Sequence, residues 1–276
     1  MSVWAAILMA GSGSRFGGDK VSLIVRGKPL WRYSFEALLA HPEVAGVGLV
    51  CAADRVDALR AEAPEAGFVV EGGADRMSSS RRAVEAMPDA TEIALIHDAA
   101  RPMVFPEVVS SVIEAARRAG GAAPAIDCVD TARMVEKNGE RLLLDRRTIK
   151  LMQTPQGAKI GLLRGAYDAP GATTATDEMA LLEAVDVHPE LVAGRPESLK
   201  IPYPADLARF AGLLGAPETR TGIGYDTHVF SSDPQRALWL GGVHFEGERG
   251  LEGQEIPQTP AISRLPCQQA SGSCFR

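Results

Sequence analysis

The sequence predicts an α/β fold in which a mostly parallel, Rossmann-like sheet carries helices on both faces. Short apolar runs alternate with stretches of helical period from residue 4 to residue 120, and this alternation is typical of βαβ units. The chain has 276 residues, of which 46% are hydrophobic, so it can bury a large core. Right-handed crossovers would place the loops that follow the strands along one edge of the sheet, where ligands bind in such folds.

The expected elements follow one another in regular order from the N-terminus. Apolar runs indicate strands at residues 4–10, 44–51, 67–73 and 92–99. Amphipathic patterns indicate the helices that follow these strands, at residues 29–41, 55–63, 78–87 and 106–120. Farther along the chain, the patterns predict helices at residues 157–168, 176–185 and 203–215, and a strand at residues 197–201.

The alternation stops between Asp127 and Asp145, where two extended runs flank the dipeptide Asn138-Gly139. This is the strongest short-range signal for a hairpin, and it predicts a protruding β-arm at about residues 127–146. A two-stranded arm cannot bury both of its faces on its own sheet. We therefore expect the arm to pack against a second subunit, as in a homodimer.

Charge and composition argue against several classes of partner. The net charge is −6, and no run of Lys or Arg is longer than a pair, so binding of nucleic acid through phosphate neutralisation is not expected. No apolar run approaches the roughly 18 residues of a membrane span, and the N-terminal run resembles a first strand more than a signal peptide. The four cysteines lack the spacing of a disulfide framework or a zinc site. A cytoplasmic location is expected.

The loop after the first strand, residues 8–20, has the composition of a phosphate-binding loop. Gly11 and Gly13 would let backbone N–H groups approach phosphate oxygens closely. Phe16 replaces the third glycine of the dinucleotide fingerprint, and the end of the loop lacks the Walker pattern. Arg15 and Lys20 supply two cations, which phosphoryl or nucleotidyl transfer requires. The alternative is a flexible turn with two solvated charges.

An ordered set of motifs carries a resemblance to a known family. These are LMAGSGSRFGGDK (8–20), GGADRMSSS (72–80), HDAARP (97–102), DT (130–131), DRRTIKLMQTPQ (145–156), TDE (176–178) and GRPESLKI (194–201). Together they resemble the 2-C-methyl-D-erythritol 4-phosphate cytidylyltransferase family of the non-mevalonate isoprenoid pathway, whose fold is of the nucleotidyltransferase type. The resemblance implies a cytidylyltransferase domain at residues 1–214 that transfers CMP from CTP to methylerythritol phosphate and releases pyrophosphate. The alternatives are a sugar-1-phosphate nucleotidyltransferase and a non-catalytic nucleotide-binding module.

The resemblance also implies roles for residues at matched positions. Arg15 and Lys20 would stabilise the charge that develops around the α-phosphorus of CTP. Arg146 and Lys200 would hold the phosphate of methylerythritol phosphate, with Arg147 as a neighbouring candidate for the role of Arg146. Mg²⁺ would bind largely through the CTP phosphates.

Further matched positions would bind the substrates: Ala10, Gly11, Gly13, Gly73, Ser79, Asp98, Arg101, Thr131, Thr154 and Thr176. Two of these motifs also have a purely structural alternative. Residues 72–80 fit a loop followed by a serine-rich helix N-cap, and Asp98 with Arg101 fits a buried structural ion pair.

After a predicted linker at residues 215–220, residues 221–253 are similar to the first part of 2-C-methyl-D-erythritol 2,4-cyclodiphosphate synthase. Asp226 and His228 match two ligands of that family's divalent metal, usually zinc, whereas Gln254 stands where the third ligand belongs. We expect lyase activity and metal binding only in a full-length form, and a short incomplete domain here. Residues 254–276 lack periodicity and are expected to be disordered. The change of character at residue 254 suggests a change of reading frame or a sequencing error, a hypothesis that resequencing would test.

Overall fold

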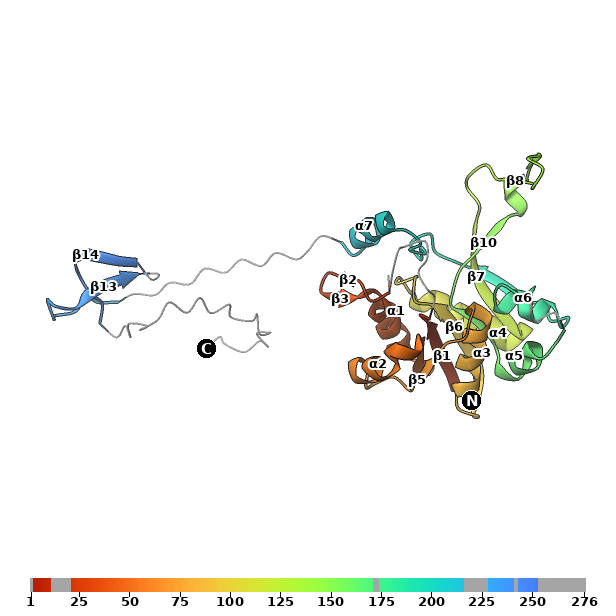
Figure 1. The fold of residues 1–276 in the computed structure, drawn as a ribbon, viewed down its shortest axis with the longest axis horizontal. Helices are drawn as coiled ribbons and strands as arrows, with labels where there is room; N and C mark the ends of the chain where they lie inside the picture. The colour runs from red at the N-terminus through yellow and green to blue at the C-terminus, as the bar shows by residue number, and fades with distance from the viewer. Residues whose placement is uncertain (1, 11–20, 171–173, 216–227, 241–242, 253–276) are drawn as a thin grey trace. The chain divides into compact units, whose positions relative to one another are not determined.

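The computed structural model describes residues 2–10, 21–170, 174–215, 228–240 and 243–252 (Figure 1). The chain divides into two compact units, residues 1–216 and residues 217–276. Arg15, Lys20 and Asp226, which carry much of the predicted chemistry, lie outside the described residues, as do Gly11, Gly13 and Gln254.

An eight-stranded sheet in the order β10-β7-β11-β6-β1-β4-β5, with β12 also paired to β7, forms the centre of the first unit. Strands β6, β1, β4 and β5 run parallel to one another, and β12 runs parallel to β7. Because β11 runs antiparallel to both β6 and β7, β6 and β7 point the same way. The mostly parallel sheet predicted from the sequence is thus confirmed. Its strands are β1 (Ser2–Leu8), β4 (Val44–Cys51), β5 (Phe68–Glu71), β6 (Thr91–Asp98), β7 (Gly121–Asp127), β10 (Lys150–Met152), β11 (Gln156–Lys159) and β12 (Glu190–Ala193).

Helices cover both faces of this sheet (Figure 1). The described helices of the first unit are α1 (Leu30–Leu39), α2 (Val56–Glu62), α3 (Arg76–Ala86), α4 (Pro106–Ala119), α5 (Ile160–Tyr167), α6 (Glu178–Glu183) and α7 (Pro204–Leu213). Successive strand residues point to opposite faces. Ile93 and Leu95 of β6 accordingly join the core beneath α1, α2 and α4, whereas Ala94 and Ile96 join the core beneath α3, α5 and α6.

The helix α1 shows how spacing in the sequence becomes packing. Trp31, Phe35 and Leu38 recur at helical spacing on one face and are at most 1% exposed. The Trp31 and Phe35 rings meet edge to face, with centroids 5.7 Å apart, a geometry that aromatic pairs prefer. Burying a side chain of this size contributes roughly 1.5–3 kcal/mol, so this apolar face is sufficient to hold α1 on the sheet.

The predicted β-arm is present. Strands β8 (Arg133–Val135) and β9 (Arg141–Leu143) pair antiparallel, and Gly139 takes a φ of +86° in the turn. The side chain of Asn138 supports this turn by accepting a hydrogen bond from the N–H of Glu140 at 2.8 Å. The arm extends from β7 and β10 away from the body of the first unit (Figure 1).

Two predictions about local structure were wrong. Residues 197–201, predicted as a strand, form a loop, because their backbone is bound by a turn and by side chains instead of a neighbouring strand. The N–H of Ser198, for example, bonds the carbonyl of Arg195 at 2.9 Å. The helix predicted from residue 157 begins at Ile160, because Gln156–Lys159 forms β11 between β6 and β7. Helical periodicity cannot reveal a strand inserted from a distant part of the chain.

Short pairings complete the described structure. In the first unit, β2 (Ile24–Val25) and β3 (Lys28–Pro29) form a small antiparallel ribbon. In the second unit, β13 (Ala237–Leu240) pairs antiparallel with β14 (Val243–Arg249), and Trp239 stacks on His244 with ring centroids 4.9 Å apart. No helix in the described part of the chain has the length and apolar character needed to cross a membrane.

Candidate active site

The ends of the parallel strands gather the predicted motifs at one edge of the sheet. Leu8, the last residue of β1, lies opposite Val50 of β4 and Asp98 of β6. The N–H of Met9 bonds the carbonyl of Val50 at 2.8 Å. The glycine-rich loop therefore leaves β1 between the ends of β4 and β6. Ala10 is the last described residue before the undescribed part of that loop.

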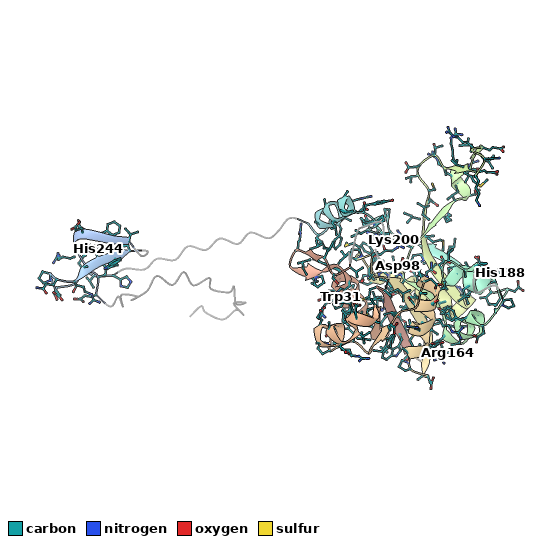
Figure 2. All side chains as sticks on the ribbon, in the orientation of Figure 1. Trp31, Asp98, Arg164, His188, Lys200 and His244 are labelled. Carbon is teal, nitrogen blue, oxygen red and sulfur yellow. The ribbon has the colours of Figure 1, made fainter. Side chains whose placement is uncertain are left out.

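Asp98 lies at this edge and joins two cations that are distant in sequence. Its Oδ2 accepts a hydrogen bond from Nζ of Lys200 at 2.7 Å, and its Oδ1 accepts one from Nε of Arg76 at 3.1 Å. Figure 2 shows Asp98 and Lys200 beside each other. The side chain of Asp98 is 13% exposed, whereas that of Lys200 is 47% exposed. The Asp98 carboxylate thus anchors a lysine whose side chain stays about half exposed.

Burial and charge oppose each other at Asp98. Burial alone would raise the pKa of this carboxyl, but the positive charges of Arg76 and Lys200 outweigh it and hold the pKa far below its ordinary value. At Arg76, burial acts to lower the pKa, and the charges of Glu178 and Asp98 raise it overall. Both groups are therefore ionised across the physiological range.

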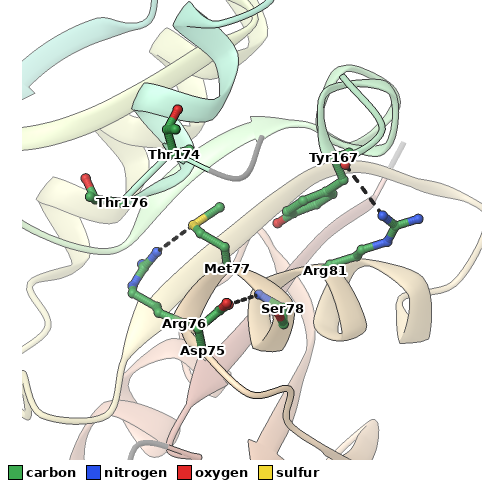
Figure 3. Close-up of a pocket in the computed structure, with 9 residues that line it drawn as sticks. Asp75, Arg76, Met77, Ser78, Arg81, Tyr167, Thr174 and Thr176 are labelled. Carbon is green, nitrogen blue, oxygen red and sulfur yellow. Dashed lines mark hydrogen bonds between the residues drawn. The ribbon is translucent and has the colours of Figure 1, made fainter. Parts of the chain in front are cut away.

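A second carboxylate holds the other end of Arg76. The two terminal guanidinium nitrogens of Arg76 donate to Oε1 and Oε2 of Glu178 at 3.0 and 2.9 Å. Ser80 also donates to Oε1 of Glu178, at 2.7 Å, and its Oγ lies 2.6 Å from the hydroxyl of Tyr167. A cavity of about 550 Å³ adjoins this group and is lined by the first turns of α3, Tyr167 and residues 174–176 (Figure 3). The predicted binding residue Thr176 lies in this cavity wall.

His97 and Thr154 form a hydrogen-bonded chain behind Asp98. The backbone N–H of Asp98 donates to Oγ1 of Thr154 at 3.2 Å, and this hydroxyl lies 2.9 Å from Nδ1 of His97. Nε2 of His97 lies 2.9 Å from the carbonyl oxygen of Arg101. Because a carbonyl only accepts, Nε2 must carry the proton and Nδ1 must accept from Thr154. Burial lowers the pKa of His97 to about 4, which keeps this ring neutral.

Arg101 holds the loop that carries Lys200 by hydrogen bonds to backbone carbonyl groups. Its terminal nitrogens donate to the carbonyl oxygens of Ser198 at 2.7 Å and Met152 at 3.0 Å. The structural alternative of an Asp98–Arg101 ion pair is wrong, because Asp98 instead pairs with Arg76 and Lys200.

The motif at residues 72–80 forms a tight loop before α3. The N–H of Gly73 donates to Oγ of Ser79 at 3.0 Å, and Ser79 donates to the carbonyl of Asp75 at 2.8 Å. A Cβ on Gly73 would lie 2.2 Å from Cβ of Ser78, so the turn requires glycine there. The helix cap is Asp75, which accepts from the N–H of Ser78 at 2.7 Å. In the alternative interpretation of a loop followed by a serine-rich cap, the loop and the capped helix are present, but the capping residue is Asp75, and the serines are the third to fifth residues of α3.

Two other predicted residues meet on the arm. Thr131 and Arg146 line a cavity of about 440 Å³ together with residues 143–145. Arg146 donates to the carbonyl of Val129 at 2.7 Å, and Arg147 instead binds the carboxylate of Asp145. In the part of the chain that the structure describes, no hydrogen bond or ion pair joins this arm cluster to the cluster around Asp98.

The predicted second metal site lies mostly outside the described residues. His228 is described and exposed, just before an isolated bridge between Phe230 and Leu251. Within the described ranges there is no group of three or more His, Cys, Asp or Glu side chains that could hold a metal ion.

Sequence reasoning missed Arg76, Glu178 and His97. Each stands inside a motif singled out above, within three positions of a residue that received a role. The available signal was a charged or titratable residue in a motif at a strand end or helix start. The contacts that place Arg76 and Glu178 in the site join residues 22 and 102 positions apart, which spacing along the chain does not show.

The fold and the site together define a nucleotidyltransferase-type α/β protein with a half-exposed lysine held by Asp98 at the carboxyl edge of its sheet. The family described as IspD, 2-C-methyl-D-erythritol 4-phosphate cytidylyltransferase, matches residues 3–215. The chain belongs to this family.

Relatives and solved structures agree with that assignment. The chain is 43% identical over 254 residues to the bifunctional enzyme IspD/IspF of Anaeromyxobacter dehalogenans, covering 88% of this chain and 64% of the relative. The 2-C-methyl-D-erythritol 4-phosphate cytidylyltransferase of Thermus thermophilus has a TM-score of 0.64 and 30% identity, covering 78% and 99% of the two chains. The bifunctional IspDF of Campylobacter jejuni has a TM-score of 0.67 and 27% identity, covering 91% of this chain and 65% of that one. The chain thus spans slightly less than two thirds of the first of these relatives.

Proposed function

We propose that residues 3–215 transfer CMP from CTP to 2-C-methyl-D-erythritol 4-phosphate, giving 4-diphosphocytidyl-2-C-methyl-D-erythritol and pyrophosphate. The family match over this whole range carries the proposal. The site adds physical support, since Lys200 is held at the sheet edge by Asp98 and its side chain stays about half exposed. An ammonium group of this kind suits a phosphate monoester.

The proposed reaction is a direct displacement. An oxygen of the methylerythritol phosphate attacks the α-phosphorus of CTP, a new P–O bond forms, and the bond to the pyrophosphate oxygen breaks. A phosphate oxygen is already anionic at neutral pH, so the step needs positioning and charge stabilisation more than a general base. Lys200 and Arg146 orient the attacking phosphate, while Arg15 and Lys20 stabilise charge on the α-phosphate and the leaving group.

In the proposal, the loops at the carboxyl edge of the sheet bind the nucleotide. Gly73 and Ser79 shape the turn expected to receive the cytosine, and Ala10 begins the loop expected to cradle the phosphates together with Gly11 and Gly13. Mg²⁺ is part of the proposal only as an ion carried by CTP. Both oxygens of Asp98 already accept hydrogen bonds from cations, so this carboxylate does not suit a metal ligand.

We further propose a homodimer formed through the arm. Val129, Val135, Leu142 and Leu143 of the arm are each more than half exposed, and an isolated hairpin is only marginally stable in water. Within one chain, Arg146 lies in the arm cluster, apart from Lys200. In the proposed dimer, the arm of one subunit brings its arginine to the phosphate site of the other.

The second activity of the bifunctional relatives is proposed only for a chain that carries their complete second domain. The described part of residues 217–276 contains the β13–β14 hairpin and His228. Zinc binding by Asp226 and His228 belongs to the same conditional proposal. The cytoplasmic location expected from the sequence stays a prediction.

Pyrophosphate release tests the main proposal. Folded protein should release pyrophosphate from CTP with methylerythritol phosphate, and much more slowly with a sugar 1-phosphate. Lys200→Ala should raise KM for methylerythritol phosphate far more than KM for CTP. Lys28→Ala serves as the control, because Lys28 pairs with Glu36 on the surface. Absence of turnover by folded protein, or equal effects of Lys200→Ala on both substrates, would contradict the assignment.

A further inference from the structure

Glu178 is a buried carboxylate that the proposed reaction does not use. Its whole residue is 0% exposed, and no other Asp or Glu in the described ranges is buried to this degree. Burying a carboxylate costs several kcal/mol unless it is paired and hydrogen-bonded. The site of Glu178 meets this requirement through two hydrogen bonds from Arg76 and one from Ser80. Glu178 thus holds a buried charge against Arg76, which lines the adjoining cavity.

Hydrogen bonds hold both the backbone and the side chain of Glu178 in place. Its N–H donates to Oε1 of Gln156 at 3.1 Å, and the amide of Gln156 donates to Asp177 at 2.9 Å. Because Ser80 donates its proton to Glu178, the hydroxyl of Tyr167 must donate to Ser80. These contacts attach the start of α6 to β11, α3 and α5. The carboxylate is therefore held rigidly in front of Arg76.

Arg76 transmits that position to Asp98. A guanidinium group is planar and rigid, so fixing its two terminal nitrogens on Glu178 also fixes the direction of its Nε. That Nε donates to Oδ1 of Asp98 at 3.1 Å, and Oδ2 of Asp98 is left for Nζ of Lys200 at 2.7 Å. Arg76 can reach Asp98 with only one nitrogen while Glu178 holds the other two.

We propose that Glu178 is a positioning residue for Lys200, acting through Arg76 and Asp98; the inference rests on the proposed role of Lys200 in binding the substrate phosphate. Without the carboxylate of Glu178, Arg76 is free to turn its terminal nitrogens onto Asp98 and form a two-bond pair, which is the strong arginine–carboxylate geometry. This pairing takes Oδ2 from Lys200. The ammonium group then loses its fixed place at the sheet edge.

Kinetics of Glu178→Gln test the proposal. The amide keeps the shape of the side chain but removes its charge and places N–H groups against Arg76. We expect KM for methylerythritol phosphate to rise about tenfold or more, the usual scale for losing a charged hydrogen bond, with KM for CTP nearly unchanged. Glu190→Gln is the matched control, because Glu190 binds Arg118 through both oxygens, away from Asp98 and Lys200. An equal rise in both KM values, or no rise, would overturn the proposal.

A double-mutant cycle separates positioning from general destabilisation. If Glu178 acts through Lys200, Glu178→Gln should add little to the KM defect of Lys200→Ala. Fully additive effects would overturn the proposed coupling. If Glu178→Gln does not fold, Tyr167→Phe replaces it, since this variant removes only the hydroxyl that supports Ser80. It should shift KM for methylerythritol phosphate in the same direction by a smaller factor, and an unchanged value would count against the proposal.

A crystal structure of the folded Glu178→Gln variant shows the positions of Arg76 and Lys200 directly, without an activity assay. The expected result is Arg76 turned onto Asp98, with Nζ of Lys200 withdrawn from Oδ2. A variant that keeps the Arg76–Asp98–Lys200 contacts would overturn the inference even if the wild-type protein is active. The opposite outcome is also informative. If the variant shows this rearrangement but the wild-type protein releases no pyrophosphate, the positioning role is supported and only the proposed function is contradicted.

Discussion

Acidification should destabilise the protein and disturb the contacts around Asp98 by protonating His97. The ring is fully buried, and its Nδ1 accepts a hydrogen bond from Thr154 while its Nε2 donates to the carbonyl of Arg101. Protonation at Nδ1 would reverse the first of these bonds, because Nδ1 would then donate to Oγ1 of Thr154, and it would place a positive charge next to Arg101 and Arg76. Thr154 also accepts from the backbone of Asp98. Charging His97 therefore disturbs the residue that anchors Lys200.

The size of the effect follows from the pKa of His97. Burial lowers this pKa from 6.5 to about 4. At a pH between these two values, His97 is protonated in the unfolded chain and neutral in the folded chain. Stability then rises with pH across this window and falls as the pH drops through it. At 1.36 kcal/mol per pKa unit, the difference amounts to about 3 kcal/mol. That is a large fraction of the 5–15 kcal/mol that typically stabilises a domain.

Urea unfolding between pH 7.5 and pH 4 measures this loss. Other groups also titrate in that range, so the informative quantity is the difference between wild type and His97→Gln. The variant should lose about 3 kcal/mol less than wild type over the window. His188→Gln is the control, because His188 is exposed on the surface, and it should follow wild type. If the wild-type His97 ring titrates near 6.5 by NMR, or if both variants lose equal stability, the reasoning fails.

Three further perturbations address other parts of the chain. Asp98→Asn leaves Arg76 and Lys200 without their shared carboxylate, so the unfolding free energy at pH 7 should fall by roughly 3 kcal/mol. Below the ordinary carboxyl pKa of 3.8 the unfolded wild-type chain takes up a proton that folded Asp98 does not yet bind, and the stability that wild type loses in this way as the pH falls should be absent from the variant. An equally acid-sensitive variant would contradict this. Gly73→Ala places a Cβ 2.2 Å from Cβ of Ser78, so KM for CTP should rise severalfold in steady-state assays, whereas Gly161→Ala, whose Cβ meets nothing within 4 Å, should behave as wild type. Leu142→Asp charges the exposed apolar arm and should shift sedimentation from dimer towards monomer; a variant that sediments as wild type would argue against the arm interface.

Local patterns were sufficient for much of the fold. The apolar runs at residues 44–51 and 92–99 became β4 and β6, since a strand buried on both faces reads as a continuous apolar run. Asn138-Gly139 predicted the arm because that dipeptide tolerates the positive φ of a tight turn. By contrast, β12 went unpredicted. Its residues alternate between half-buried and exposed at the edge of the sheet, and only its pairing with β7 makes it a strand.

The site shows the same division at the level of single residues. The motifs placed Asp98 at a strand end, and therefore at the edge of the sheet where ligands bind. The resemblance gave Lys200 a role but did not place it beside Asp98. The partners of these residues could not be read in this way. Arg76 lies on α3 and Glu178 on α6, and they are 102 residues apart; spacing along the chain carries no information about such a contact.

The amino-acid sequence alone therefore specified the α/β class, the arm and the motifs that identify the family. Each of these depends on neighbours within a few residues or on an ordered set of short segments. The network that holds Lys200 in place depends on where α3, α5, α6 and β11 come to lie around Asp98. Burial selects those partners: a carboxylate such as Glu178 is tolerated in the interior only where the fold supplies a matching cation and hydroxyl groups. Such a match exists only after the distant segments have packed together.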